Sequence, residues 1–144
     1  MTLSAKLTEL VELIAEKRGW KLFKKDGCWE FDVKCDAEDR LQKVKLELST
    51  SKKGTEWLDI TSQIYNAKEL GTGGRAPSAT DLLEKNHELL FGICYAIRKK
   101  DNMLVTKAAV PMMHLEQDEL ENMIWEAANK ADAIEKDLYS KDVE

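Results

Sequence analysis

Residues 28–35 read CWEFDVKC, and their alternation is the clearest indication of the fold class. Every second residue from Trp29 to Cys35 is apolar and the residues between them are polar, which is the period of a strand with one buried and one wet face. Just before it, Asp26-Gly27 is a strong hairpin signal because this dipeptide tolerates positive φ. We therefore predict a strand over 28–36, paired in a hairpin with a strand over 20–25.

The neighbouring segments extend this hairpin in both directions. The same alternation recurs over 42–50 and 56–64, so four consecutive strands form an antiparallel meander. On the amino-terminal side, leucines, Val11 and Ile14 recur at steps of three and four with glutamates between them, which predicts an amphipathic helix over 3–18. Lys17, Arg18 and Gly19 supply a basic last turn and a helix stop.

The second half of the chain also has helical and strand patterns, with two strands in place of four. A glycine-rich stretch, 66–79, has no apolar periodicity and is expected to be a loop. Ser78 and Asp81 resemble a capping pair for a helix over 80–90. Strands over 91–99 and 103–110 and a long helix over 115–139 complete the chain. The order helix, four strands, helix, two strands, helix predicts an α+β fold with an antiparallel sheet, as a single domain over 1–144.

Composition narrows the class of protein. The chain has 144 residues, 43% hydrophobic and 34% charged, with 7 Gly and 2 Pro, which excludes a disordered or collagen-like polypeptide. Its charges, 22 basic minus 27 acidic, sum to −5, so nucleic acid and anionic membranes are not expected partners. Charged residues interrupt the amino-terminal segment and no membrane-spanning stretch follows, so we expect a cytoplasmic protein.

Four short motifs in the second half are similar to a known family. They are LLEKN at 82–86, YAI at 95–97, VP at 110–111 and ADAIEKDL at 131–138. Over Thr80 to Asp142 the chain resembles the YbjN-type proteins, small bacterial proteins that share the fold of type III secretion chaperones. The resemblance implies a small acidic dimer that holds other polypeptides or acts in regulation, without chemistry. Secretion chaperones have three strands before the second helix, whereas four are expected here.

No enzymatic or metal chemistry is predicted. Three cysteines and two histidines occur without CxxC or HExxH spacing, so neither a metal nor another cofactor is expected. Cys94 with His87 lacks an orienting third group, and a buried small residue is the favoured reading of the cysteine. We expect no catalytic residue.

The loop within 66–79 leaves one ligand-binding alternative open. Gly71, Gly73, Gly74 and Arg75 offer backbone N–H groups and a positive charge to an anion or nucleotide. The lysine and hydroxyl residue of a P-loop are missing, so a flexible connector is favoured over an anion site.

The outer side of the sheet suggests a surface for a partner. Gly92, Cys94 and Ala96 alternate with larger residues and permit close approach, and Trp57 stands among polar neighbours. The second helix of the chain, a second subunit or a client polypeptide would cover this area. We therefore expect a non-enzymatic, homodimeric protein-binding module of chaperone-like or regulatory type; the alternative is a small-ligand or anion binder using residues 71–75.

Overall fold

The computed structural model describes residues 3–25, 27–35, 40–66 and 77–140. In the first half, helix α1 (Leu3–Arg18) precedes four strands, which are β1 (Lys21–Lys25), β2 (Cys28–Lys34), β3 (Leu41–Thr50) and β4 (Glu56–Asn66). In the second half come helix α2 (Ala79–Lys85), a 3₁₀ turn η2 (Asn86–Glu88), strands β5 (Cys94–Arg98) and β6 (Met103–Pro111), and helix α3 (Gln117–Ser140). The predicted α+β class and element order are confirmed, including four strands before the second helix.

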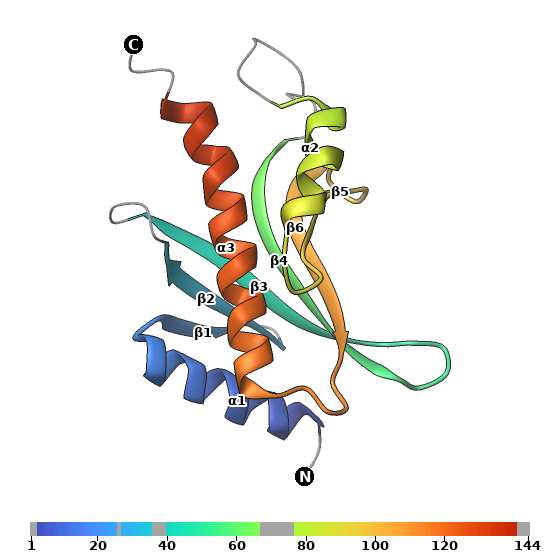
Figure 1. Cartoon of the computed structure of the whole chain (residues 1–144). Helices are drawn as coiled ribbons and strands as arrows, with labels where there is room; N and C mark the ends of the chain where they lie inside the picture. Colours follow the sequence, from blue (N-terminus) through green and yellow to red (C-terminus); the bar gives the residue numbers. More distant parts are fainter. Residues whose placement is uncertain (1–2, 26, 36–39, 67–76, 141–144) are drawn as a thin grey trace.

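The strands form one six-stranded antiparallel sheet in the order β1-β2-β3-β4-β6-β5 (Figure 1). The β6 strand lies between β4 and β5, so the second hairpin joins the meander through β4. A bulge between Gln63 and Tyr65 shifts the register of β4 against β6 near its end. The two edges of the sheet are β1 and β5, both five residues long.

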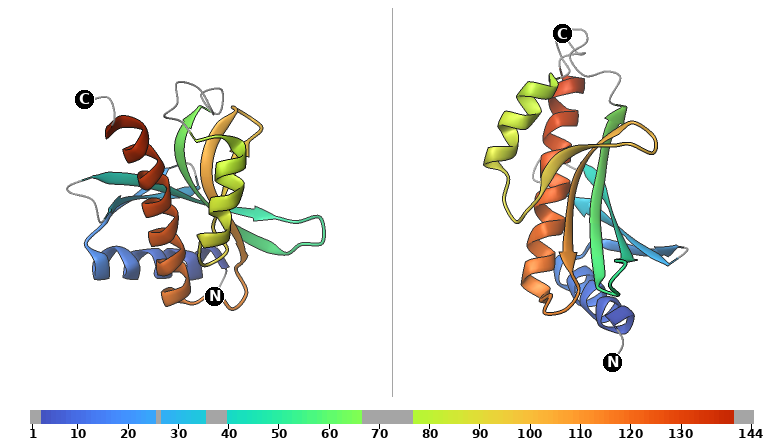
Figure 2. Two further views of the ribbon diagram at one scale, coloured as in Figure 1. Left: turned by 45° about the horizontal axis from the view of Figure 1, so that its top comes forward. Right: turned by 90° about the vertical axis from the view of Figure 1, so that its right-hand side faces the viewer.

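The inner face of the sheet is the face on which all three helices lie. The α1 side chains Leu7, Val11 and Ile14 join the main core with Trp29 and Phe31 of β2. Figure 2 shows α3 and α2 on the same side of β4 and β6. The sheet alternation therefore works as predicted, because its apolar positions are covered by amphipathic helices.

A second, smaller core lies at the β5 edge. Leu82 of α2 packs with Tyr95 of β5, Leu104 of β6, and Ala131 and Ile134 of α3. This contact places α2 beside α3 on the inner face. The expectation that the second helix covers the outer face is therefore wrong, and no helix in the described part of the chain lies there.

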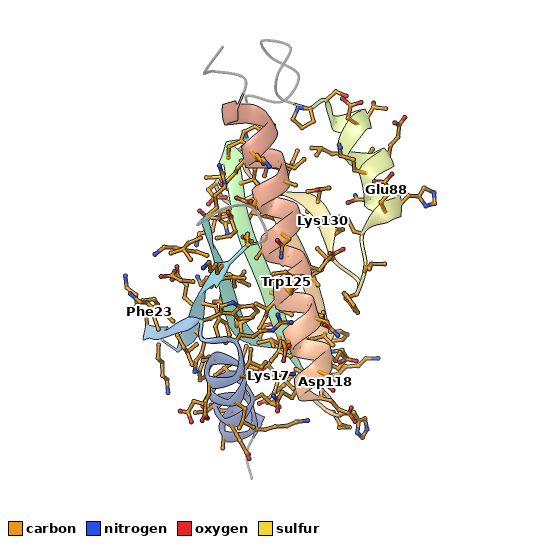
Figure 3. The ribbon with its side chains drawn as sticks, turned by 60° about the vertical axis from the view of Figure 1, so that its left-hand side comes forward. Lys17, Phe23, Glu88, Asp118, Trp125 and Lys130 are labelled. Atoms are coloured by element: carbon orange, nitrogen blue, oxygen red, sulfur yellow. The ribbon has the colours of Figure 1, made fainter. Side chains whose placement is uncertain are left out.

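An ion-pair and aromatic cluster joins the end of α1 to the start of α3. Arg18 Nε donates a hydrogen bond of 2.8 Å to Glu121 Oε2, and Lys17 Nζ lies 3.1 Å from Glu121 Oε1. The Arg18 guanidinium also lies over the rings of Trp20 and Trp125, 5.3 and 5.1 Å from their centroids. Those two rings stack with their centroids 6.1 Å apart. Figure 3 shows Lys17 and Trp125 in this region.

Charge and burial compete at Glu121. Its side chain is only 6% exposed, and burial alone would raise its pKa. The hydrogen-bonding cations Lys17 and Arg18 outweigh burial and hold the pKa of Glu121 below its usual value. The carboxylate is therefore kept charged between two helices that are far apart in sequence.

The predicted boundaries are wrong in one region, between α2 and β5. A helix over 80–90 and a strand from 91 were expected, but α2 ends at Lys85 and β5 begins only at Cys94. Leu89 has an extended backbone, which ends the 3₁₀ turn. Phe91 and Gly92 both have positive φ, 59° and 74°, so they form a turn and not a strand. Elsewhere the ends of the elements differ from expectation by one or two residues, the ordinary uncertainty of such boundaries.

Candidate functional site

An apolar groove runs between α2 and the edge strand β5. Its volume is about 230 Å³. The residues that line it are Ala79, Leu82, Leu83, Asn86, Tyr95, Ala96, Ile97 and Leu104. The polar groups of its side chains are the Asn86 amide and the Tyr95 hydroxyl, and the others are apolar. The groove therefore suits an apolar side chain of a partner.

Side chain to backbone bonds fix both walls of this groove. Ser78 and Asp81 form a capping box that starts α2, as predicted from their spacing. At the other end, Asn86 Oδ1 accepts a hydrogen bond of 2.7 Å from Tyr95 N, and Asn86 Nδ2 donates one of 3.4 Å to Tyr95 O. The Tyr95 hydroxyl donates to the Lys130 carbonyl of α3 at 3.2 Å. Both polar atoms of the Asn86 amide are therefore hydrogen-bonded to β5, which leaves the groove surface apolar.

Large apolar side chains are exposed along this edge of the molecule. Leu83 is 70% exposed and Ile97 48% exposed, and both line the groove. Leu90 and Phe91 are also exposed, in the turn that leads from η2 to β5. Leu90 N donates a hydrogen bond of 2.8 Å to the buried carboxylate of Glu126, which anchors this turn to α3. An anchored turn that exposes two apolar side chains is typical of a contact surface.

The backbone of Phe91 adds to this interpretation. A φ of 59° is rare for a bulky aromatic residue and costs roughly 1–3 kcal/mol. Such conformations persist where the surrounding structure holds them, here through the Glu126 bond to the preceding residue. The sequence contained a signal for these exposed residues: adjacent leucines, 82–83 and 89–90, cannot both face one core from a helix.

The structure separates the four residues that were predicted to form a partner surface. Cys94 and Ala96 lie together on the outer face of β5, opposite Lys107 and Val105 of β6. Gly92 lies in the turn before the strand. Trp57 is also on the outer face but pairs with Pro111, six positions beyond Val105 along β6, about 20 Å away at ~3.4 Å per residue. Only Cys94 and Ala96 therefore share one patch.

The predicted anion loop is not among the residues that the structure describes. Gly71, Gly73, Gly74 and Arg75 lie outside the described residues. Anion binding there stays a prediction. Within the described ranges, no three His, Cys, Asp or Glu side chains gather as a metal site would require, and no helix is long and apolar enough to cross a membrane.

A polar network lies between the carboxyl-terminal part of α3 and the strands below it. Arg40 Nε donates a hydrogen bond of 2.6 Å to Asp132 Oδ1, and its guanidinium lies 3.7 Å from Glu135. Gln42 Nε2 donates to Ser62 Oγ at 3.0 Å. Burial raises the pKa of Glu135, and the hydrogen bond with Gln42 and the charge of Arg40 only partly oppose it.

We expect Glu135→Gln to raise the free energy of unfolding at pH 7 by up to about 1 kcal/mol, because a raised pKa means that folding disfavours the charged carboxylate. The difference should shrink as pH falls through the raised pKa of the folded state and vanish below the pKa of the unfolded state. Urea denaturation of both proteins at pH 7 and at acid pH measures this. Glu119→Gln, at an exposed position of the same helix, is the control. A destabilised Glu135→Gln at pH 7 would contradict the prediction.

Comparison with known proteins shows the fold. No family model and no curated protein matches the chain. Among solved structures, the ExsC-ExsE complex contains a chain that is 17% identical with a TM-score of 0.63, covering 96% of this chain and 97% of that one. The HopA1-SchA chaperone-effector complex contains one that is 13% identical with a TM-score of 0.61, covering 92% and 95%. The α+β fold of type III secretion chaperones, predicted from the sequence, is confirmed along almost the whole chain.

Proposed function

We propose that the protein is a non-enzymatic, homodimeric, chaperone-like protein of the cytoplasm that holds another polypeptide. The observation that carries this proposal is the row of exposed apolar side chains along α2 and β5, beside a groove with almost no polar lining. The fold likeness supports it, because one of the similar structures is a chaperone-effector complex.

The second copy of the chain is the proposed occupant of the groove edge. Leu83 and Ile97 flank the groove, while Leu90 and Phe91 are exposed in the turn next to it. One copy therefore offers both a hollow and protruding apolar groups, which a two-fold symmetric pair can match to each other. Burying ~400 Å² of apolar area at ~25 cal/mol per Å² gives ~10 kcal/mol gross, comparable with the ~4–15 kcal/mol cost of association. Because the two free energies are similar, we expect a dimer of modest affinity.

The motifs that resemble the YbjN-type proteins support a relationship to that family. Leu82 and Asn86 come from LLEKN, Tyr95 from YAI, and Ala131 and Ile134 from ADAIEKDL. Leu82, Tyr95, Ala131 and Ile134 pack in one cluster, and Asn86 bonds to Tyr95. The motifs therefore describe one structural unit, the one that builds the groove.

Capture of a partner tests the proposed function. The tagged chain is expressed in the organism that encodes it, retained polypeptides are identified, and each is then purified with the chain alone. We expect a stable complex of the two purified components, with a mass by light scattering that corresponds to a dimer of this chain and the bound polypeptide. The tag without the chain is the control. If no retained polypeptide binds the purified chain, the proposal is wrong.

A further inference from the structure

A hollow on the outer face of the sheet has an apolar floor and a basic rim. We call it the outer trough; its volume is about 320 Å³, and its lining residues are Thr61, Ala96, Ile97, Arg98, Lys99, Val105 and Lys107. Half-buried Ala96 lies on its floor, and Val105, the pairing partner of Ala96 across β5 and β6, is only 1% exposed and lies beneath the surface. Three of the seven lining residues are basic and none is acidic. The outer trough contains Ala96, which the sequence singled out as part of a partner surface.

The positive charge of the outer trough is only partly neutralised. Arg98 donates two hydrogen bonds, of 2.9 and 2.6 Å, to the carboxylate of Asp101. By contrast, no carboxylate of the described residues lies within 4.0 Å of Lys99 or Lys107, which are both exposed. Two ammonium groups therefore flank an apolar floor, in a chain whose net charge is −5.

A second hollow continues the outer trough toward β3. It measures about 490 Å³ and shares Thr61 and Arg98 with the outer trough. Two lysines, Lys43 and Lys45, and two carboxylates, Glu30 and Glu135, line it. Lys43 lies 3.7 Å from Glu30, and Lys45 lies 3.7 Å from Glu47. Exposed ion pairs of this kind contribute at most about 1 kcal/mol, so a partner's carboxylate can replace them. Basic side chains therefore lie on β5, β6 and β3, over roughly 14 Å at ~4.8 Å per strand, with Thr61 of β4 between them.

We propose that the outer trough binds an acidic segment of a polypeptide partner, with one apolar side chain of the segment against Ala96. Carboxylates on either side of that residue reach Lys99 and Lys107, and further ones reach Lys43 and Lys45. This inference rests on the proposed protein-binding function and names the chemistry of the partner. The outer trough shares Ala96 and Ile97 with the α2–β5 groove, so the peptide and the second copy would contact β5 side by side.

The charges on the rest of the outer face favour a polypeptide over a nucleic acid. Glu30, Asp32, Glu47 and Asp59 occupy outward positions of β2, β3 and β4. A continuous polyanion crossing the face would meet these carboxylates as well as the lysines. A peptide has carboxylates at chosen positions only, and its apolar side chains suit the floor of the trough.

Binding of a designed peptide tests the proposal. The probe is a fluorescein-labelled peptide of about twelve residues that contains glutamates on both sides of a central leucine, followed by fluorescence anisotropy at low salt. We expect the wild-type chain to bind it, and Lys99→Glu/Lys107→Glu to bind at least about tenfold more weakly. The matched control is Lys52→Glu/Lys53→Glu, which makes the same change in net charge at exposed positions of the β3–β4 turn and should bind as the wild type does.

Four results would overturn the proposal. They are no binding of the peptide, equal binding by both double variants, equal binding of the peptide with glutamine in place of glutamate, and binding of single-stranded DNA in preference to the peptide. Binding of the captured polypeptide to the double variant distinguishes failure of this proposal from failure of the proposed function. If it binds Lys99→Glu/Lys107→Glu as tightly as wild type, the trough assignment fails while the function stands; if no polypeptide is captured, the function itself fails.

Discussion

Replacing Arg18 with alanine should lower the free energy of unfolding by about 2 kcal/mol. The change removes the hydrogen bond to Glu121, leaves that buried carboxylate with Lys17 alone, and removes the cation from the faces of Trp20 and Trp125. Loss of a fully buried ion-pair partner costs about 3–5 kcal/mol, and we reduce this figure because the Arg18 side chain is 34% exposed. Urea denaturation followed by tryptophan fluorescence measures the effect.

The pH dependence of this loss identifies its cause. The pKa of Glu121 is lowered in the fold, so the stability that its charge supplies is present above the unfolded pKa and is lost as pH falls through the folded pKa. The difference between wild type and Arg18→Ala should therefore shrink on strong acidification. Lys17→Ala is the control, because Lys17 is 55% exposed and contacts neither ring; its effect should stay below about 1 kcal/mol. Equal losses for the two variants would contradict the assignment to Arg18.

Replacing Ile97 with glutamate should weaken the proposed dimer at least about a hundredfold and leave a folded monomer at micromolar concentration. The substitution removes an apolar contact from the groove edge and would place a carboxylate without a partner in the interface. Ile97 is 48% exposed in the single chain, so the substitution leaves the core intact. Light scattering combined with circular dichroism distinguishes a folded monomer from an unfolded chain.

Phe23 supplies a matched control for this experiment. It is 47% exposed, on the opposite edge strand β1, and is labelled in Figure 3. Phe23→Glu makes the same chemical change to the protein surface away from the groove, and should leave the dimer intact. A wild-type chain that is already monomeric, or equal effects of both variants, would show that the α2–β5 edge is not the interface.

The sequence predicted local structure well where one face of an element is buried. The alternation from Trp29 to Cys35 and the Asp26-Gly27 hairpin signal depend only on neighbours along the chain, and the period of two leaves one register that buries the apolar side chains. The capping pair Ser78 and Asp81 is local in the same way.

The predictions are wrong where contacts between distant parts of the chain determine the local structure. Leu89 to Gly92 continue both a helical and an alternating pattern, and the bond from Leu90 to Glu126 on α3 is a long-range contact that favours the turn. The face on which α2 lies depends on Leu82 packing against α3, which no local spacing indicates. The same limit hid the outer trough, because Lys99 and Lys107 meet Thr61 only through the pairing of β6 with both β4 and β5.

The strand order has a consequence for how the chain acquires its structure. The pairs β1–β2, β2–β3 and β3–β4 each join consecutive strands, whereas the β4–β6 pair joins opposite halves of the chain. Contacts between distant segments form slowly, because the entropy of closing the intervening loop is lost before the contacts compensate for it. We expect the first four strands to assemble early and to wait with β4 as an open edge, whose Leu58 and Ile60 are still unshielded by α3. A newly made chain is therefore most prone to aggregation in the interval before its last strand and last helix arrive.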